Sequence, residues 1–357
     1  MKKLTYSLLP LGIAVGLCLN TAPASAGLLV QELIPNAALS IDGFGSTTNS
    51  GVIQANIPAG STIQRAYLYA TSVWDLSPVY GVTFEGNTLS LGSATTLGPN
   101  SNPATTVRWD VTNIIASSFT TGGLQNFSIV ENGPVPTNDG AALVVAYSNL
   151  STQGFTSVIL DGELSTTGDT VQFDFASPYS GGDFLVSLAA SFSLQPVLGG
   201  SGQQVTVIDV TTNSTNNRRL TTSAGGADDR TTGQTSANGN LITVGGIGDN
   251  PANPNPTIQP NPFGVGNPDD EYYNLALGNS ASATPFILPG DTFLRLTTRN
   301  PSNDDNIFGL FITSAFQISS ANITSTSIPE PSITLGIFGI GTIGALLSRR
   351  DKKRNRE

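Results

Sequence analysis

The sequence predicts an all-β protein whose body is a β-sandwich or jelly-roll-like fold, and three observations support this fold class. The composition combines 39 Gly and 22 Pro with only 11% charged residues, whereas helical bundles are rich in Ala, Leu, Glu and Lys. Short apolar stretches recur along the body, and Gly, Pro and Asn separate them, as in proteins built from many short strands. A hydrophobic period of about 3.6 residues is nearly absent, so strands are expected to form the core.

Nine segments of the body are expected to be strands. Two of them alternate strictly between apolar and polar side chains, which is typical of a strand with one buried face. In one of these, Val107 and Trp109 share the apolar face. Several others are apolar on both faces and are expected to be central strands, and one or two helical turns are expected at 112–118. The nine segments are 65–74, 105–111, 140–148, 156–164, 169–175, 183–194, 203–210, 291–298 and 307–318.

Composition also divides the chain into five parts. The third part is rich in Asn, Pro and Gly, apart from one strand-like stretch at 241–248. A segment so poor in apolar residues cannot offset its ordering entropy by burial alone, so we expect it to be exposed. The five parts are a signal peptide with a signal helix (1–26), a β-sandwich (27–210), a polar excursion or linker (211–268), remaining strands of the sandwich or of a second lobe (269–324), and a C-terminal segment (327–357) with a short transmembrane helix (332–348) and a basic tail (349–357).

The charged residues are distributed unevenly along the chain. The net charge is −10, but residues 27–327 hold seven Arg, no Lys and 22 Asp plus Glu, which leaves the body at −15. Binding to nucleic-acid phosphates depends on clustered Lys and Arg. A nucleic acid is therefore not expected as a partner.

Missing residue types exclude several kinds of chemistry. The chain has no His, and its single cysteine, Cys18, lies in the N-terminal apolar segment. These absences exclude Ser-His-Asp and Cys-His nucleophilic catalysis and every His-dependent metal site. We therefore expect that the protein is not an enzyme. A secreted carboxylate-dependent hydrolase is kept as an alternative, because a pair of catalytic carboxylates needs only Asp or Glu.

The N-terminus has the layout of a cleavable secretory signal peptide. Two lysines open the chain, an apolar stretch covers residues 8–19, and the small residues Ala24 and Ala26 precede Gly27. Signal peptidase is therefore an expected partner, and the expected cut lies between Ala26 and Gly27. Two alternatives are an uncut membrane anchor and a lipoprotein site at Cys18.

The C-terminus combines an apolar run with a dense basic tail. Residues 333–347 are apolar, interrupted only by Thr and Gly, and the run is somewhat shorter than the roughly twenty residues of a comfortable membrane span. Positive charge stays on the cytoplasmic side of a membrane, so the body is expected outside the cytoplasm, held transiently at the inner membrane. The basic residues are Arg349, Arg350, Lys352, Lys353, Arg354 and Arg356.

A triplet of Pro329, Glu330 and Pro331 precedes this apolar run. The triplet, the Gly-rich apolar segment and the tail that starts at Arg349 and Arg350 resemble the PEP-CTERM sorting signal of Gram-negative and cyanobacterial surface proteins. The resemblance implies processing near the triplet by an exosortase, a membrane cysteine protease, followed by transfer to the cell surface or release. The strands of the body are similar to those of an uncharacterised β-rich surface domain, a resemblance that implies no activity.

The expected function is that of an exported cell-envelope or extracellular-matrix protein, such as a biofilm matrix component, with a structural or adhesive role. Exopolysaccharide or other surface proteins are the expected partners of the body. The first alternative is a calcium- or carbohydrate-binding module. Exposed aromatic rings would serve a carbohydrate, and the candidates are Trp74, Trp109, Tyr272 and Tyr273. Trp109 lies on the apolar face of an alternating strand and is expected in the core, whereas Tyr272 and Tyr273 follow an acidic loop.

Calcium is the one cofactor considered, because loop carboxylates and carbonyls are the hard oxygen ligands that it prefers. No stretch of the chain fits the spacing of an EF-hand loop. Solvated turn residues on an acidic surface are the alternative interpretation of the same clusters. The candidate calcium ligands are Asp269, Asp270, Glu271, Asp304 and Asp305.

Overall fold

The structure of the chain is a computed structural model. It describes residues 27–45, 49–72, 79–98, 106–119, 121–133, 138–163, 168–191, 206–224, 242–249, 251–252, 271–279, 281–299, 306–318 and 323–327. Strands make up most of these residues, which confirms the all-β prediction. The predicted signal helix, transmembrane helix and basic tail lie outside the described residues.

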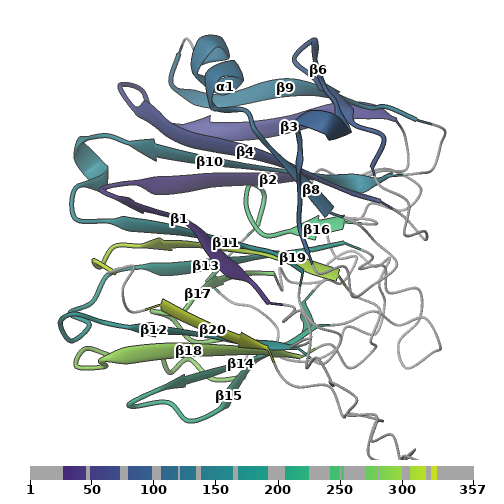
Figure 1. The fold of residues 1–357 in the computed structure, drawn as a ribbon. Coiled ribbons are helices and arrows are strands. Elements are labelled where there is room, and N and C mark those ends of the chain that lie inside the picture. The colour runs from purple at the N-terminus through teal and green to yellow at the C-terminus, as the bar shows by residue number, and fades with distance from the viewer. Residues whose placement is uncertain are drawn as a thin grey trace, which may run out of the picture.

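Four sheets stack as layers, and we number them 1 to 4 from the top to the bottom of Figure 1. All strand pairs recorded in the described parts of the chain are antiparallel. Sheet 1 has the order β3 (Ser50–Ile57), β9 (Gly123–Glu131), β5 (Val82–Phe84), β6 (Asn87–Leu89). Sheet 2 has the order β2 (Ala38–Gly45), β10 (Asn138–Ser148), β4 (Thr62–Ser72), β8 (Thr106–Asp110), β7 (Thr95–Thr96).

Apart from the N-terminal strand β1, the strands of sheets 3 and 4 follow those of sheets 1 and 2 along the chain. Sheet 3 has the order β1 (Leu29–Pro35), β11 (Thr156–Asp161), β19 (Asn306–Ser314), β13 (Phe184–Ser191), β16 (Ile242–Val244), and β17 (Tyr272–Asn274) also pairs with β13. Sheet 4 has the order β15 (Arg218–Ala224), β14 (Thr206–Thr212), β18 (Phe293–Arg299), β12 (Asp169–Asp174), β20 (Ile323–Ser327). Because β1 joins sheet 3, the first described strand lies in the same half of the stack as β20, the last described strand (Figure 1).

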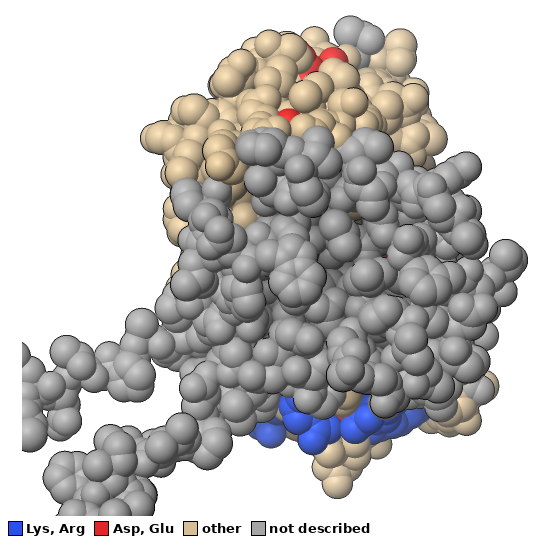
Figure 2. Space-filling view, turned by 90° about the vertical axis from the view of Figure 1, so that its right-hand side faces the viewer, with Lys and Arg blue, Asp and Glu red and all other residues tan. Residues whose placement is uncertain are grey.

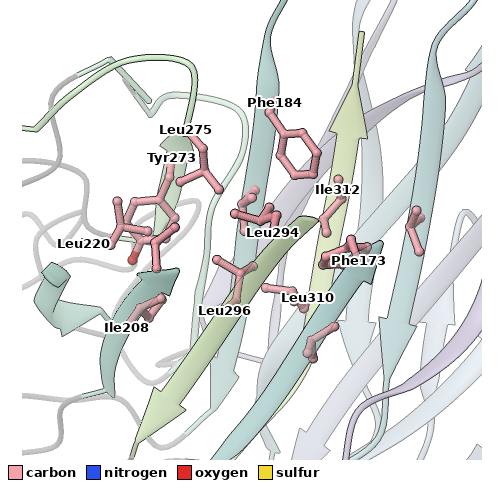
Figure 3. Packing of buried hydrophobic residues seen from close by; sticks show 14 of the residues in the cluster. Phe173, Phe184, Ile208, Leu220, Tyr273, Leu275, Leu294, Leu296, Leu310 and Ile312 are labelled. Atoms are coloured by element: carbon pink, nitrogen blue, oxygen red, sulfur yellow. The ribbon is translucent and has the colours of Figure 1, made fainter. Parts of the chain in front are cut away.

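Three apolar layers fill the spaces between the four sheets. Phe84, Trp109 and Phe127 belong to the layer between sheets 1 and 2, and Tyr69 and Phe311 to the layer between sheets 2 and 3. The third layer, between sheets 3 and 4, is shown in Figure 3, where side chains from β12 and β18 meet side chains from β13 and β19. Both middle sheets are therefore covered on their two faces, as the apolar sequences of their central strands require.

The predicted strands agree with the observed ones. Each of the nine predicted segments overlaps a strand, and β10, β11 and β19, which are apolar on both faces, each lie between two neighbouring strands. The predicted helical turns are the helix α1 (Thr112–Ser118), which buries Ile115 and begins where Asp110 accepts a hydrogen bond from the Thr112 amide. Two short 3-10 helices, η1 (Leu91–Ser93) and η2 (Leu150–Thr152), complete the described elements.

The region predicted as a polar excursion contains two described strands. β15 pairs with β14 and buries Leu220, and β16 coincides with the predicted strand-like stretch at 241–248. The prediction that the polar segments are exposed is thus wrong for the buried residues of β15, because hydrogen bonding to β14 holds this strand in sheet 4. β16 agrees with the strand-like stretch that the sequence predicts. The assignment of the body as a β-sandwich and the proposed domain boundaries stay predictions.

Candidate functional site

The described body ends at β20, an edge strand of sheet 4. Among the described strands β20 pairs with β12 alone, and its first residue, Ile323, packs against the apolar layer between sheets 3 and 4. Its last residue, Ser327, pairs with Asp169. The predicted sorting residues Pro329 to Pro331 and the basic tail follow beyond the described residues. In the part of the chain that the structure describes, no helix has the length and apolar character to span a membrane.

The described body begins beside this same strand. Gly27 and Leu28 are buried, and the Leu28 amide donates a 2.9 Å hydrogen bond to Oδ2 of Asp169. The Ser325 hydroxyl of β20 lies 3.4 Å from the same oxygen. Burial raises the pKa of the Asp169 carboxyl, and the hydrogen bonds from Leu28, Thr170 and Ser325 act in the opposite direction. One buried carboxylate therefore contacts both ends of the described chain. The predicted cleavage residues Ala24 and Ala26 lie outside the described residues.

A second buried polar cluster joins sheets 2 and 3. The Arg108 guanidinium pairs with the Asp161 carboxylate, which also accepts a 2.8 Å hydrogen bond from the Tyr69 hydroxyl. The Tyr67 ring lies 4.9 Å from the guanidinium carbon. Burial raises the pKa of Tyr69 well above its ordinary value, and the charge of Asp161 adds to this effect. Because the three polar groups satisfy one another, the cluster is best explained as a structural link between the layers.

The outer face of sheet 4 carries a group of arginines. Arg219 and Arg299 both pair with the buried carboxylate of Asp209. Arg295 instead donates two hydrogen bonds, of 2.9 and 2.6 Å, to the amide oxygen of Gln172. Figure 2 shows Lys and Arg side chains gathered at the lower end of the molecule, where sheet 4 lies. The face therefore concentrates positive charge on a body whose net charge is strongly negative.

The predicted calcium ligands are not brought together by the described residues. Glu271 is fully buried next to β17, and the other four candidates, Asp269, Asp270, Asp304 and Asp305, lie outside the described parts of the chain. Among the described residues, no group of three or more acidic side chains has the arrangement of a metal site. Calcium binding thus stays a prediction.

The two tyrosines proposed for carbohydrate binding differ in their surroundings. Tyr273 is fully buried in the apolar layer between sheets 3 and 4, so its predicted exposure is wrong. Tyr272 alternates to the other face of β17 and is half-buried, and burial raises its pKa to about 12. The two adjacent rings point to opposite faces of a strand and cannot form one platform.

Sequence reasoning missed Asp169, the pair of Arg108 and Asp161, and the arginine face of sheet 4. The arginine face had a sequence signal, because three of the seven arginines of the body, Arg219, Arg295 and Arg299, lie in two short stretches. The two buried carboxylates had none, since each is one of 22 acids of the body. Only the pairing of distant strands shows which acids are enclosed.

The comparison with known families concerns the C-terminus. The chain is an all-β protein with a C-terminal sorting signal, since the PEP-CTERM protein-sorting motif matches residues 327–352. This match confirms the resemblance seen in the sequence and supports a PEP-CTERM protein, a class that is exported and sorted by an exosortase. The matched motif starts at Ser327, the last residue of β20. The search of curated proteins found no match to the chain.

Proposed function

We propose that the protein is an exported structural or adhesive component of the cell envelope or extracellular matrix, and that it is not an enzyme. The observation that carries this proposal is the sorting motif, which begins directly at the edge strand β20. The layered body supports it, because stacked sheets with three apolar layers give a rigid unit suited to display. In this proposal the four sheets form two β-sandwiches, sheets 1 with 2 and sheets 3 with 4.

The maturation step is tested by mass spectrometry of the protein from its host. We expect the mature chain to start at Gly27 and to lack the apolar segment and basic tail that follow the triplet. Replacing Pro329 and Pro331 with Ala allows the segment to become helical, which removes the extended conformation that a protease cleft requires. This variant should accumulate with its C-terminus intact.

The chain offers a matched control for this test. Pro254 and Pro256 frame an Asn with the same spacing as the sorting triplet, so their double replacement by Ala should leave maturation unchanged. An intact basic tail on the mature wild-type protein would contradict the proposal.

A second candidate function is the binding of an anionic polysaccharide, and the arginine face of sheet 4 favours it. Arg295 is exposed and donates its hydrogen bonds to a neutral amide, and none of the ion pairs of the described residues involves it. Arg219 and Arg299 share the single carboxylate of Asp209. Planar guanidinium groups on a flat sheet are well suited to carboxylate or sulfate groups of a polymer.

This candidate is tested with alginate, a polyuronate, and with neutral dextran as a control polymer. Binding of alginate should weaken with added salt, and Arg295→Gln should lower the affinity by about two- to fivefold, the contribution of one exposed charge. Arg65→Gln is the matched control, because Arg65 of β4 pairs with two carboxylates, Glu32 of β1 and Asp110 of β8. Equal binding of dextran and alginate would exclude this function.

A further inference from the structure

Asp169 is a buried carboxylate for which the described chain supplies no cation. Its exposed fraction is 1%, and none of the ion pairs of the described residues involves it. Among the described residues, its carboxylate accepts hydrogen bonds from neutral donors alone, the amides of Leu28 and Thr170 and the hydroxyl of Ser325. Removing a carboxylate from water is unfavourable unless a positive charge compensates it.

The body has few cations that could compensate Asp169. It contains no Lys between residues 4 and 351, so only its arginines carry a permanent positive charge. The six described arginines all engage other groups: carboxylates for Arg65, Arg108, Arg219 and Arg299, main-chain carbonyls for Arg218, and Gln172 for Arg295. A further cation could come from a chain terminus.

Gly27 is the residue positioned to supply it. A side-chain carbon built on Gly27 would lie only 3.1 Å from Oδ2 of Asp169 and 3.8 Å from the Ser325 hydroxyl. The amino nitrogen of Gly27 is bonded to the same α-carbon. Once the peptide bond to Ala26 is cut, rotation about the bond between this α-carbon and the carbonyl carbon can therefore bring the nitrogen to the same place beside the carboxylate. Gly162 leaves room for Gly27 at this place, because a side-chain carbon on Gly162 would lie only 2.4 Å from the Gly27 carbonyl oxygen.

We propose that removal of the signal peptide creates an α-ammonium group on Gly27 that forms a buried ion pair with Asp169. The inference rests on the proposed export and on cleavage after Ala26. Hydrolysis of the Ala26–Gly27 peptide bond consumes one water molecule and breaks the bond between the carbonyl carbon and the nitrogen. Ala26 keeps the new carboxylate, and the released amine takes up a proton, since α-amino groups have pKa values of about 7.7–8.0.

The ion pair gives N-terminal processing a structural consequence. Before cleavage the Gly27 nitrogen belongs to a neutral peptide group, and Asp169 has only neutral partners. After cleavage the carboxylate is compensated, and burial of the pair raises the pKa of Asp169 less than burial of the isolated acid. Because Ser325 of β20 contacts the same oxygen, the ammonium is placed beside the strand at which the sorting motif begins.

The test uses the full chain, exported and matured in a bacterial host, and measures how fast the α-amine of Gly27 reacts with trace acetic anhydride at pH 8. The absence of lysine from the body makes this the single amine between residues 27 and 351, and peptide mass spectrometry separates it from Lys352 and Lys353. We expect the amine of the folded wild type to react at least about fivefold more slowly than that of Asp169→Asn, because pH 8 lies close to the ordinary pKa of an α-amine and a pKa one unit higher lowers the neutral fraction by about that factor.

Two further variants make the outcome decisive. Asp174→Asn removes a carboxylate from the outer face of the same strand and should react as slowly as the wild type. A glycine inserted between Ala26 and Gly27 moves the new terminus one residue away while Asp169 stays intact, and its amine should react at the ordinary rate even if Asp169→Asn fails to fold. Fluorescence of the buried Trp109 reports whether each variant is folded.

Each result bears on the ion pair. A mature chain that starts at another residue overturns the cleavage site and the ion pair together. A chain that starts at Gly27 but whose amine reacts as fast as in the glycine-insertion variant overturns the ion pair alone, and the proposed export stands. Slow labelling in the wild type and in Asp174→Asn, with fast labelling in the other two variants, supports it.

Discussion

At the scale of single residues, Arg108 shows how a polar face of a strand becomes part of the interior. Val107 and Trp109 point into the layer between sheets 1 and 2, as the alternating sequence predicts. Arg108 points the other way, but that side of sheet 2 is covered by sheet 3, and only 9% of the residue is exposed. The guanidinium is tolerated there because Asp161 of β11 compensates its charge.

Removing one partner of this pair should be costly. Asp161→Asn leaves the Arg108 charge buried without a counter-charge, so we expect the free energy of unfolding to fall by about 3–5 kcal/mol. Urea unfolding followed by Trp109 fluorescence measures the change. The double variant Arg108→Met with Asp161→Leu should recover most of this loss, because apolar side chains replace both charges.

An exposed arginine provides the comparison for this prediction. Arg65 also pairs with two carboxylates, at 3.1 Å each, but more than a third of its side chain is exposed. Its replacement by Met should change the free energy of unfolding by less than about 1 kcal/mol. Equal effects of the Arg65 and Asp161 replacements would mean that burial does not govern the strength of these pairs.

The Tyr69 hydroxyl makes the stability of the protein depend on alkaline pH. Its pKa in the folded protein is raised well above the ordinary tyrosine value of 10.0 by burial and by Asp161. A group with a raised folded pKa stabilises the protein fully below its unfolded pKa, and this contribution is lost as the pH rises through the folded value. The difference in unfolding free energy between the wild type and Tyr69→Phe should therefore be constant up to about pH 9 and shrink above pH 10.

Urea unfolding of both proteins at pH 7, 9 and 11 tests this expectation. The other seven tyrosines are common to both proteins, so their ionisation largely cancels in the difference. Below pH 9 the lost hydrogen bond to a charged acceptor should cost about 1.5–3 kcal/mol. A difference that stays constant to pH 11 would contradict the raised pKa of Tyr69.

At the scale of elements, β10 shows why a glycine is needed where three strands meet. The β10–β4 register shifts between Asn138 and Gly140, and Gly140 has a φ of 153°. A side chain there would overlap the Phe44 carbonyl oxygen of β2 and the Ile242 side chain of β16. This close approach lets β16 of sheet 3 lie against sheet 2, where the Ile247 amide donates to the Ile41 carbonyl.

Gly140→Ala should therefore destabilise the protein through both backbone strain and steric overlap. We expect a loss of about 3 kcal/mol or more, above the roughly 1–2 kcal/mol that a positive φ alone costs a residue with a side chain. Gly154→Ala is the control, because Gly154 has a φ of 83° and no atom near the position of an added carbon. Thermal unfolding of both variants separates the cost of steric overlap from the cost of backbone strain. Equal losses of stability in the two variants would argue against a contribution from overlap at Gly140.

The strands that were predicted and those that were missed differ in composition. Strands with continuous apolar runs, such as β10, β11 and β19, were found from the sequence because they are central in sheets 2 and 3. β15, with the sequence RRLTTSA, was missed because Leu220 is its only large apolar residue. Hydrogen bonds to β14 hold β15 as a strand, and Arg218 anchors it to the carbonyls of Ser282 and Thr284. A local sequence pattern does not contain such contacts with distant residues.

The candidate sites follow the same division. The sorting motif was recognised because it is a local sequence pattern, and the family comparison confirms it. The buried site of Asp169 unites residues 27, 169 and 325, which are far apart in the chain. Such a site depends on β1 joining sheet 3 and β20 joining sheet 4, and neither of these strands was predicted.

At the scale of the whole molecule, the layer between sheets 2 and 3 makes the two halves of the stack dependent on each other. Phe311 of β19 is 1% exposed, and its ring centroid lies 5.6 Å from that of Tyr69 in β4. Its neighbour Leu310 points instead into the layer between sheets 3 and 4. If either half were separated, it would expose a large apolar sheet face to water. We therefore expect the four layers to unfold as one cooperative unit.

Leu310→Ala tests this cooperativity at a distance. The substitution should lower the stability by about 2–5 kcal/mol, because it leaves a cavity in the layer between sheets 3 and 4. The experiment uses a Trp74→Phe background, so that Trp109 is the single tryptophan. Trp109 lies between sheets 1 and 2 and reports on the other half of the stack. If the protein unfolds as one unit, the Trp109 fluorescence transition moves to lower urea concentration by the shift that the whole loss of stability predicts. An unchanged Trp109 transition, with loss of structure in circular dichroism at lower urea, would show that the two halves unfold independently.

Phe311→Ala, in the shared layer, should shift the fluorescence and circular dichroism transitions together, because both halves lose contacts with the Phe311 ring.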